Sequence, residues 1–95
     1  FNASLNAVLS HVVDDEYLAV ETLVSTIKEL EPFANIYPFT SAENLLNFTQ
    51  NNPCDVAFID IKMAEMNGVS LAEKLKNNNP YINIIFVLIN DLKHL

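Results

Sequence analysis

Three aspartates follow apolar runs, in positions where their carboxylates could act together. Asp14 and Asp15 come directly after the run that ends at Val13, and Asp60 ends the run that starts at Val56. Carboxylate oxygens ligate hard divalent cations such as Mg²⁺. An aspartate can also act as a nucleophile towards phosphorus and form an aspartyl phosphate. The chemistry that these residues suggest is therefore cation binding and phosphoryl transfer to an aspartate.

Each of these acids could also have a purely structural role. Asp60 could only begin a turn, because aspartate is a common turn residue. Glu16 and one of the two neighbouring aspartates could serve only to start a helix, where acidic side chains are favourable. The coincidence of acids at the ends of two separate apolar runs favours a shared site.

Strands and helices must alternate along the chain to bring these acids together. Short apolar runs predict strands over residues 8–13, 34–39, 56–60 and 82–89, after a lead-in over residues 1–7. A short, continuous apolar run is typical of a strand that is buried on both faces of a parallel sheet. The apolar first, third and fourth strands are expected at the centre of the sheet. Pro38 lacks a donor for a neighbouring strand, so the second strand is expected at an edge.

Amphipathic patterns predict three helices between these strands. The first follows the acids and ends at Pro32, and the second ends before Asn51-Asn52-Pro53. Capping boxes at residues 40–43 and 70–73 are expected to open the second and third helices. The third helix is expected to end at residues 77–80. The expected buried faces are Val20, Leu23, Val24, Ile27 and Leu30 in the first helix, Leu45, Leu46 and Phe48 in the second, and Leu71, Ala72 and Leu75 in the third.

This alternation predicts an α/β fold with a doubly wound parallel sheet, in a single domain over residues 1–95. The carboxyl ends of parallel strands lie on one rim of the sheet. If the first and third strands are neighbours, Asp14, Asp15 and Asp60 meet there. Like charges at such short range do not all stay ionised unless a cation neutralises them. The expected cofactor is therefore a hard divalent cation with oxygen ligands, such as Mg²⁺.

The composition limits the class of partner. The 95 residues carry a formal net charge of −7, with five lysines and no arginine. Nucleic acids and anionic membranes attract basic patches, so neither is an expected partner. The single cysteine, Cys54, excludes an internal disulfide and is expected to be buried. Without a disulfide framework, a signal peptide or an apolar run of about 20 residues, the expected compartment is the cytoplasm.

Two motifs of the chain resemble those of a known family. Residues 12–16, Val-Val-Asp-Asp-Glu, followed by an amphipathic helix, resemble the opening of response-regulator receiver domains of two-component signalling. Residues 60–68 resemble the phosphorylation-site loop of these domains, in which Met, Met and Gly follow the aspartate by three, six and eight places. Met63, Met66 and Gly68 occupy these places. The resemblance covers almost the whole chain and implies a flavodoxin-like, receiver-type fold.

The resemblance also implies roles for the site. Asp60 would be the phospho-acceptor, supplied by a histidine kinase or a small phosphodonor, and its modification would switch a downstream output such as transcription. Asp15, Asp60 and the backbone carbonyl of Lys62 would ligate Mg²⁺, with Asp14 acting through water. The domain would accept phosphate on itself rather than act as an enzyme. The two methionines of the loop are expected to pack in the core, and Gly68 to adopt a conformation that a side chain disfavours.

Departures from the family pattern keep other functions open. Ala64 stands where the family usually has proline, and Leu88 stands where it has Thr or Ser. Compared with the family, only four of the usual five strands are expected within these 95 residues, without the last helices, and Lys93 is not expected to substitute for the lysine of the fifth strand. A degenerate receiver that acts as a binding or dimerisation module without phosphate is therefore the alternative. A metal-dependent hydrolase is a third, which Lys62 disfavours because it occupies the place of a general acid.

The fourth strand predicts an association. Residues 84–89 would form an exposed apolar edge, and such edges pair with other strands. A second copy of the chain, a swapped segment or a further segment is expected to cover it.

Overall fold

The computed structural model describes residues 9–63 and 66–87 of the chain. Four strands alternate with three helices: β1 (Leu9–Val13), α2 (Tyr17–Leu30), β2 (Asn35–Phe39), α3 (Ala42–Thr49), β3 (Val56–Asp60), α4 (Gly68–Asn78) and β4 (Asn83–Val87). The strands form one parallel sheet in the order β2-β1-β3-β4. The predicted α/β fold with a parallel, doubly wound sheet is confirmed.

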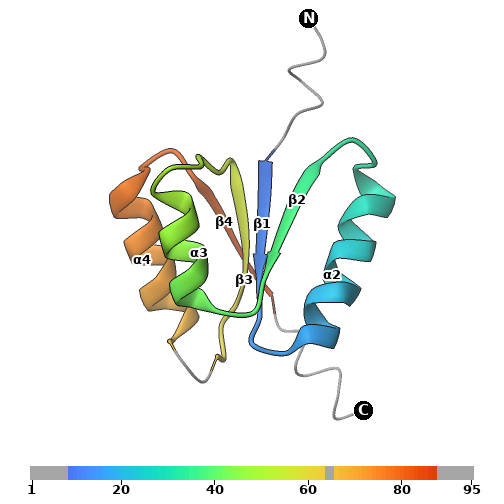
Figure 1. Ribbon diagram of the computed structural model, residues 1–95, viewed down its shortest axis with the longest axis horizontal. Helices are drawn as coiled ribbons and strands as arrows, with labels where there is room; N and C mark the ends of the chain where they lie inside the picture. The colour runs from blue at the N-terminus through green and yellow to red at the C-terminus, as the bar shows by residue number, and fades with distance from the viewer. Residues whose placement is uncertain (1–8, 64–65, 88–95) are drawn as a thin grey trace, which may run out of the picture.

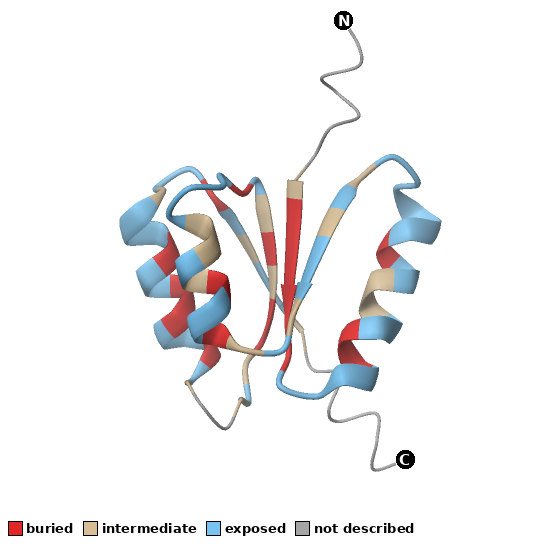
Figure 2. Ribbon diagram, in the orientation of Figure 1, coloured by how far each residue is buried: buried red, intermediate tan, exposed pale blue. Residues whose placement is uncertain are grey.

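The helices cover the two faces of the sheet. Figure 1 shows α2 on one side of the strands and α3 with α4 on the other. Against α2, Val12 packs with Val20 and Ile27. The larger core lies under α3 and α4, and Figure 2 shows its residues on the inward faces of these helices and on the central strands. It comprises Val13, Ala42, Leu45, Cys54, Ala57, Ile59, Leu71, Ala72, Leu75 and Ile82.

Two features of the elements follow the prediction, namely the edge position of β2 and the burial of Cys54. β2, which carries Pro38, lies at an edge of the sheet and pairs only with β1 among the described strands. Cys54 is buried, and burial raises the pKa of its thiol to about 11. Within the described residues, no helix has the length and apolar character that crossing a bilayer requires.

The position and burial of β4 contradict the expectation of a central strand and agree with the exposed apolar edge that was expected for residues 84–89. In the described sheet β4 pairs only with β3, so it lies at the edge opposite β2. Ile85 and Phe86 are 43% and 42% exposed. Apolar composition does not distinguish a central strand from an edge strand that another segment covers, because both require apolar side chains. The prediction extended to Leu88 and Ile89, which lie outside the described residues.

Two helix starts and one helix face also differ from the prediction. The cap of α3 is Ser41, whose hydroxyl accepts from the backbone N–H of Asn44, rather than Thr40. The cap of α4 is Asn67, so Ser70 lies inside the helix instead of opening it. Leu30, expected on the buried face of α2, is 74% exposed, because it lies in the last turn beyond the buried stripe.

Candidate functional site

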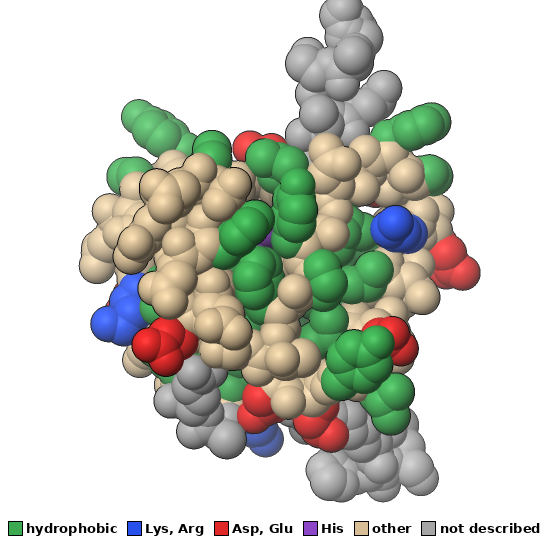
Figure 3. Space-filling model, viewed as in Figure 1, with side chains coloured by type: hydrophobic (Ala, Val, Ile, Leu, Met, Phe, Trp, Pro, Cys, Tyr) green, Lys and Arg blue, Asp and Glu red, His purple; other side chains and the backbone are tan. Residues whose placement is uncertain are grey.

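The parallel pairing of β1 and β3 brings the three aspartates to one rim. Val13 pairs with Ile59, so the residues that follow them end neighbouring strands at the same level. Asp14, Asp15 and Asp60 each offer a carboxylate oxygen, and these oxygens all lie within 4.8 Å of one another. Figure 3 shows carboxylates at the lower end of the molecule, where the β1–α2 and β3–α4 loops turn in Figure 1.

Backbone hydrogen bonds fix the two buried aspartates of this cluster. Asp14 and Asp60 are each 1% exposed, whereas Asp15 is exposed. The Asp14 Oδ1 atom accepts from the backbone N–H of Glu16 at 3.0 Å, and the Asp60 Oδ1 atom accepts from that of Lys62 at 3.1 Å. A carboxylate that accepts a backbone hydrogen bond is held in one orientation, so two members of the cluster are preorganised.

The interpretation of these aspartates as residues that only form turns or start a helix is therefore partly correct, because it describes their local hydrogen bonds. The carboxylate of Asp60 bonds the N–H two residues on, as a turn-forming aspartate does. Asp14 makes the equivalent bond ahead of α2. Glu16 is the N-cap residue of α2, but its side chain makes no capping hydrogen bond. Local turn formation and clustering coexist in the same two side chains, so neither interpretation excludes the other.

The donor set fits a hard divalent cation. Three carboxylates supply only oxygen ligands and concentrated negative charge, and Mg²⁺, Ca²⁺ and Mn²⁺ prefer such ligands over nitrogen or sulfur. The bond from the Lys62 N–H to Asp60 keeps the start of the β3–α4 loop at the same rim. The residues at this rim are therefore compatible with a cation held by the loop and the two strand ends.

Gly68 serves close packing rather than an unusual backbone conformation, which corrects the prediction. None of the described residues, this glycine included, has a positive φ. A Cβ on Gly68 would lie 2.6 Å from the carbonyl oxygen of Asp60 and 2.7 Å from the Cα of Ile61. The N–H of Gly68 also donates to the Ile61 carbonyl at 2.9 Å. The start of α4 is thus pressed against the end of β3, immediately beside Asp60.

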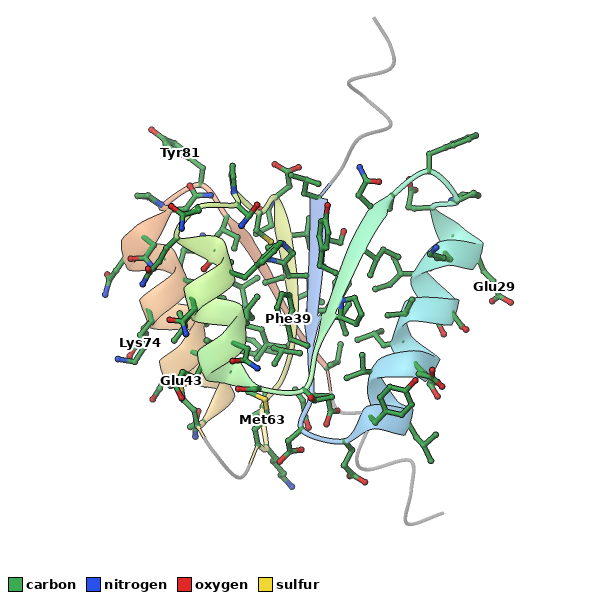
Figure 4. All side chains as sticks on the ribbon, viewed as in Figure 1. Glu29, Phe39, Glu43, Met63, Lys74 and Tyr81 are labelled. Atoms are coloured by element: carbon green, nitrogen blue, oxygen red, sulfur yellow. The ribbon has the colours of Figure 1, made fainter. Side chains whose placement is uncertain are left out.

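The remaining loop residues have structural roles. Met63 and Met66 pack against the core under α3 and α4, as predicted. Figure 4 labels Met63 near the rim that carries the aspartates. The sequence analysis missed Asn67, whose side-chain oxygen accepts from the Val69 N–H at 2.7 Å and fixes the start of α4. Its signal was an asparagine directly before a helix, where this residue type is a preferred cap.

Three of the departures from the family pattern concern residues that the structure does not describe. Ala64, Leu88 and Lys93 lie outside the described residues. The interpretation of these positions depends on the sequence alone.

The parallel α/β fold and the three aspartates at its rim are the features that the resemblance to receiver domains implied. Comparison with models of known families gives the same result. Residues 11–93 match the model of the response regulator receiver domain. The chain belongs to this family.

The chain is similar to part of longer regulatory proteins. The transcriptional regulatory protein YpdB of Escherichia coli is 33% identical over 76 residues, which are 78% of this chain and 31% of YpdB. The response regulator protein TodT of Pseudomonas putida is 29% identical over 77 residues, which are 81% of this chain and 33% of TodT. The chain therefore spans about a third of the length of these relatives.

Solved structures share the fold. A CheY-like receiver domain protein from Methanospirillum hungatei has a TM-score of 0.74 and 27% identity, over 86% of this chain and 64% of the other. The amino-terminal domain of a receiver protein from Methanoculleus marisnigri has a TM-score of 0.71 and 24% identity, over 81% and 63% of the two chains.

Proposed function

We propose that this receiver domain accepts a phosphoryl group on Asp60 in the presence of Mg²⁺ and that this modification switches an output. The observation that carries the proposal is the clustering of three carboxylates at the rim, within 4.8 Å of one another. Two of them are buried and held by backbone hydrogen bonds. A cluster used only for turn formation has no need of three acids at such short range.

The proposed step is a displacement at phosphorus. A carboxylate oxygen of Asp60 forms a bond to phosphorus while the bond from phosphorus to the donor breaks. The donor atom, the ring nitrogen of a kinase phosphohistidine or the carboxylate oxygen of acetyl phosphate, keeps the electron pair. The N–H of Lys62, which donates to Asp60 Oδ1, orients the carboxylate for this attack.

We assign the cation to the same rim. Asp15 and Asp60 would ligate Mg²⁺ directly, together with the backbone carbonyl of Lys62, and Asp14 would act through water. When bound, the ion supplies positive charge that offsets the charge of the phosphoryl oxygens. The aspartates supply the negative charge that retains it, and the exposure of Asp15 leaves one side of the site open to water and to a phosphodonor.

Removal of either amino-terminal aspartate should weaken Mg²⁺ binding. We expect Asp14→Asn and Asp15→Asn each to raise the dissociation constant about tenfold or more, as for residues that support or form a metal site. Calorimetric titration of each variant with MgCl₂ measures the change.

Glu16→Gln is the matched control, because it removes the same charge one residue away from the cluster. It should change the dissociation constant by less than about threefold, since Glu16 is exposed and is not one of the three residues whose carboxylate oxygens lie within 4.8 Å of one another. Equal weakening by all three variants would show that overall charge, and not the cluster, holds the ion.

We propose the partner and the output by analogy with other members of the family. A histidine kinase or a small phosphodonor would supply the phosphoryl group. YpdB is a transcriptional regulatory protein by name, and we propose that this domain similarly belongs to a regulator of transcription. The net charge of −7 disfavours direct contact of the domain itself with DNA.

Formation of an adduct tests the proposed function. Incubation of the protein with MgCl₂ and acetyl phosphate should add one phosphoryl group, observed as an increase of the intact mass. Beryllofluoride, followed by ¹⁹F NMR, tests the same site without the bond-breaking step. Both should require Mg²⁺, so chelation by EDTA should remove the adducts.

Leu88 supports a second candidate, a degenerate receiver that binds or dimerises without phosphate. The family has Thr or Ser at this position, and leucine has no hydroxyl to bond a phosphoryl oxygen. This candidate predicts Mg²⁺ binding at the rim but no adduct with either reagent.

We also propose that β4 pairs with or packs against another segment. Its apolar side chains include Ile85 and Phe86, both more than two-fifths exposed, on the strand that ends the described sheet. Light scattering of the 95-residue chain should therefore give a mass above that of one chain.

A charge on this strand should oppose the association. Ile85→Lys places a lysine on an edge, a common natural protection against strand pairing. The variant should have the mass of one chain, while Lys74→Ala, an exposed substitution on α4, should leave the association unchanged. A monomeric wild-type protein would contradict the proposal.

A further inference from the structure

His11 lies in the middle of β1 and is completely buried. Its ring is surrounded by the aromatic rings of Tyr37 and Phe39 on β2 and Phe48 on α3, with centroids 5.5, 5.7 and 5.4 Å away. All three contacts are edge-to-face, with interplanar angles of 67–77°. In Figure 3 the histidine colour is visible only as a small patch among hydrophobic side chains.

Within the part of the chain that the structure describes, neither ring nitrogen of His11 has a hydrogen-bond partner. Buried polar groups normally have one, so this arrangement is unusual. The neutral ring tolerates the site, because its carbon edges pack as an aromatic side chain does. A protonated ring would carry two N–H donors and a positive charge with no acceptor in a site closed to water. Burial accordingly lowers the pKa of His11 below its ordinary value.

The described residues whose rings contact His11, namely Tyr37, Phe39 and Phe48, carry no carboxylate that could stabilise a charged form. On β2, the titratable residue beside the His11 ring is Tyr37. Cys54 precedes β3 and lies near the backbone of His11. Ala57 is the register partner on β3. On α3, the single charged residue is Glu43, which is exposed in the first turn of the helix. Ring faces attract cations, but this attraction supplies no acceptor for either N–H.

The aromatic cluster is connected to the acidic rim through Phe39. The ring of Phe39 contacts His11, and its carbonyl oxygen accepts from the backbone N–H of Asp14 at 3.2 Å. Movement of Phe39 away from a charged ring would therefore disturb the backbone that positions Asp14.

We propose that His11 makes this domain sensitive to pH. In the neutral state the ring holds β1, β2 and α3 in one packed cluster. Protonation loosens the cluster and, through Phe39, the carboxyl end of β1 that carries Asp14. The inference does not depend on phosphorylation, because it concerns the packing of residues outside the acidic rim.

The direction of the effect follows from linkage. The unfolded chain binds a proton on His11 at its ordinary pKa of about 6.5, whereas the folded chain binds it only at lower pH. Stability is therefore unaffected by His11 above about pH 6.5 and falls as the pH falls below it. One group lowers the folding equilibrium constant by at most about tenfold for each pH unit.

Urea unfolding followed by circular dichroism tests the proposal. Wild type and His11→Leu, a substitution of similar size without a titratable group, are compared at about pH 7.5 and about pH 5.5, on either side of the ordinary histidine pKa. Carboxylates titrate equally in both proteins, so the difference isolates His11. The wild-type folding constant should fall about threefold to tenfold more than that of the variant. Equal pH dependence would overturn the proposal.

A second measurement does not depend on the folding of the leucine variant. The chain has one other histidine, His94, so His94→Gln leaves a single imidazole to observe by NMR. In the folded protein the His11 ring signals should keep their neutral-form shifts as the pH falls through about 6.5. A complete titration of the folded protein near the ordinary pKa would overturn the proposal.

Discussion

Asp60→Asn will abolish the phosphoryl adduct that the wild-type protein forms with Mg²⁺ and acetyl phosphate. The amide has nearly the same shape as the carboxylate, so the fold should be retained. It carries no negative charge, however, and its oxygen is a poor nucleophile towards phosphorus. Its backbone-facing oxygen can still accept from the N–H of Lys62, as Asp60 Oδ1 does at 3.1 Å. The substitution therefore removes the chemistry and leaves the local geometry in place.

Intact mass spectrometry after incubation with acetyl phosphate measures this loss, and ¹⁹F NMR measures the parallel loss of the beryllofluoride adduct. Glu73→Gln is the control, because this exposed glutamate of α4 loses the same charge outside the aspartate cluster. Its adduct should form as in the wild type. An undiminished adduct in Asp60→Asn would assign the phosphoryl group to another residue and refute the role of Asp60.

The positions of the aspartates could be predicted because they depend on topology. Acids at the ends of two apolar strands share a rim whenever the strands are parallel neighbours, whatever the detailed packing. β1 and β3 are such neighbours, so Asp14 and Asp60 meet. The sequence could not predict that Asp14 is buried while Asp15 is exposed. Whether each of these side chains is buried depends on the direction in which it points from the backbone at the end of β1.

Helix starts were harder to predict because several residues compete for the same backbone donors. Ser70 begins a capping-box pattern, yet Asn67 caps α4 and Ser70 lies one turn inside. The decisive interaction is not in the motif: Gly68 bonds to Ile61 and contacts β3, which fixes where the helix begins. A long-range contact of this kind overrides a local capping preference.

The edge position of β4 has a similar cause. A strand with Ile84, Ile85 and Phe86 has the composition of a buried strand, and composition alone does not reveal whether a neighbour is present. The sheet order β2-β1-β3-β4 decides this question. The sequence therefore predicted the type of each element reliably, whereas the apolar composition of β4 was compatible both with a central strand and with the exposed edge that the described sheet shows.

Gly68→Ala should destabilise the fold by about 1–3 kcal/mol, the usual cost of overpacking a close contact. In an exposed helix interior the same substitution would stabilise by up to about 1 kcal/mol, because alanine is the better helix former. Here the added Cβ would lie 2.6 Å from the Asp60 carbonyl oxygen and 2.7 Å from the Ile61 Cα. Both are backbone atoms, so no side-chain rotation relieves the contact. The start of α4 or the end of β3 must move, and the loss exceeds the gain in helix propensity.

Urea unfolding measures the loss of stability, with Ser70→Ala as the control. Ser70 is exposed two residues further along α4, so the same alanine there should leave stability unchanged or slightly higher. Because the displaced backbone carries Asp60, Gly68→Ala should also slow formation of the acetyl phosphate adduct under conditions in which the variant is fully folded. A variant as stable as the wild type, with an unchanged rate, would mean that α4 shifts without cost. The close approach of α4 to β3 would then have no part in holding Asp60 in position.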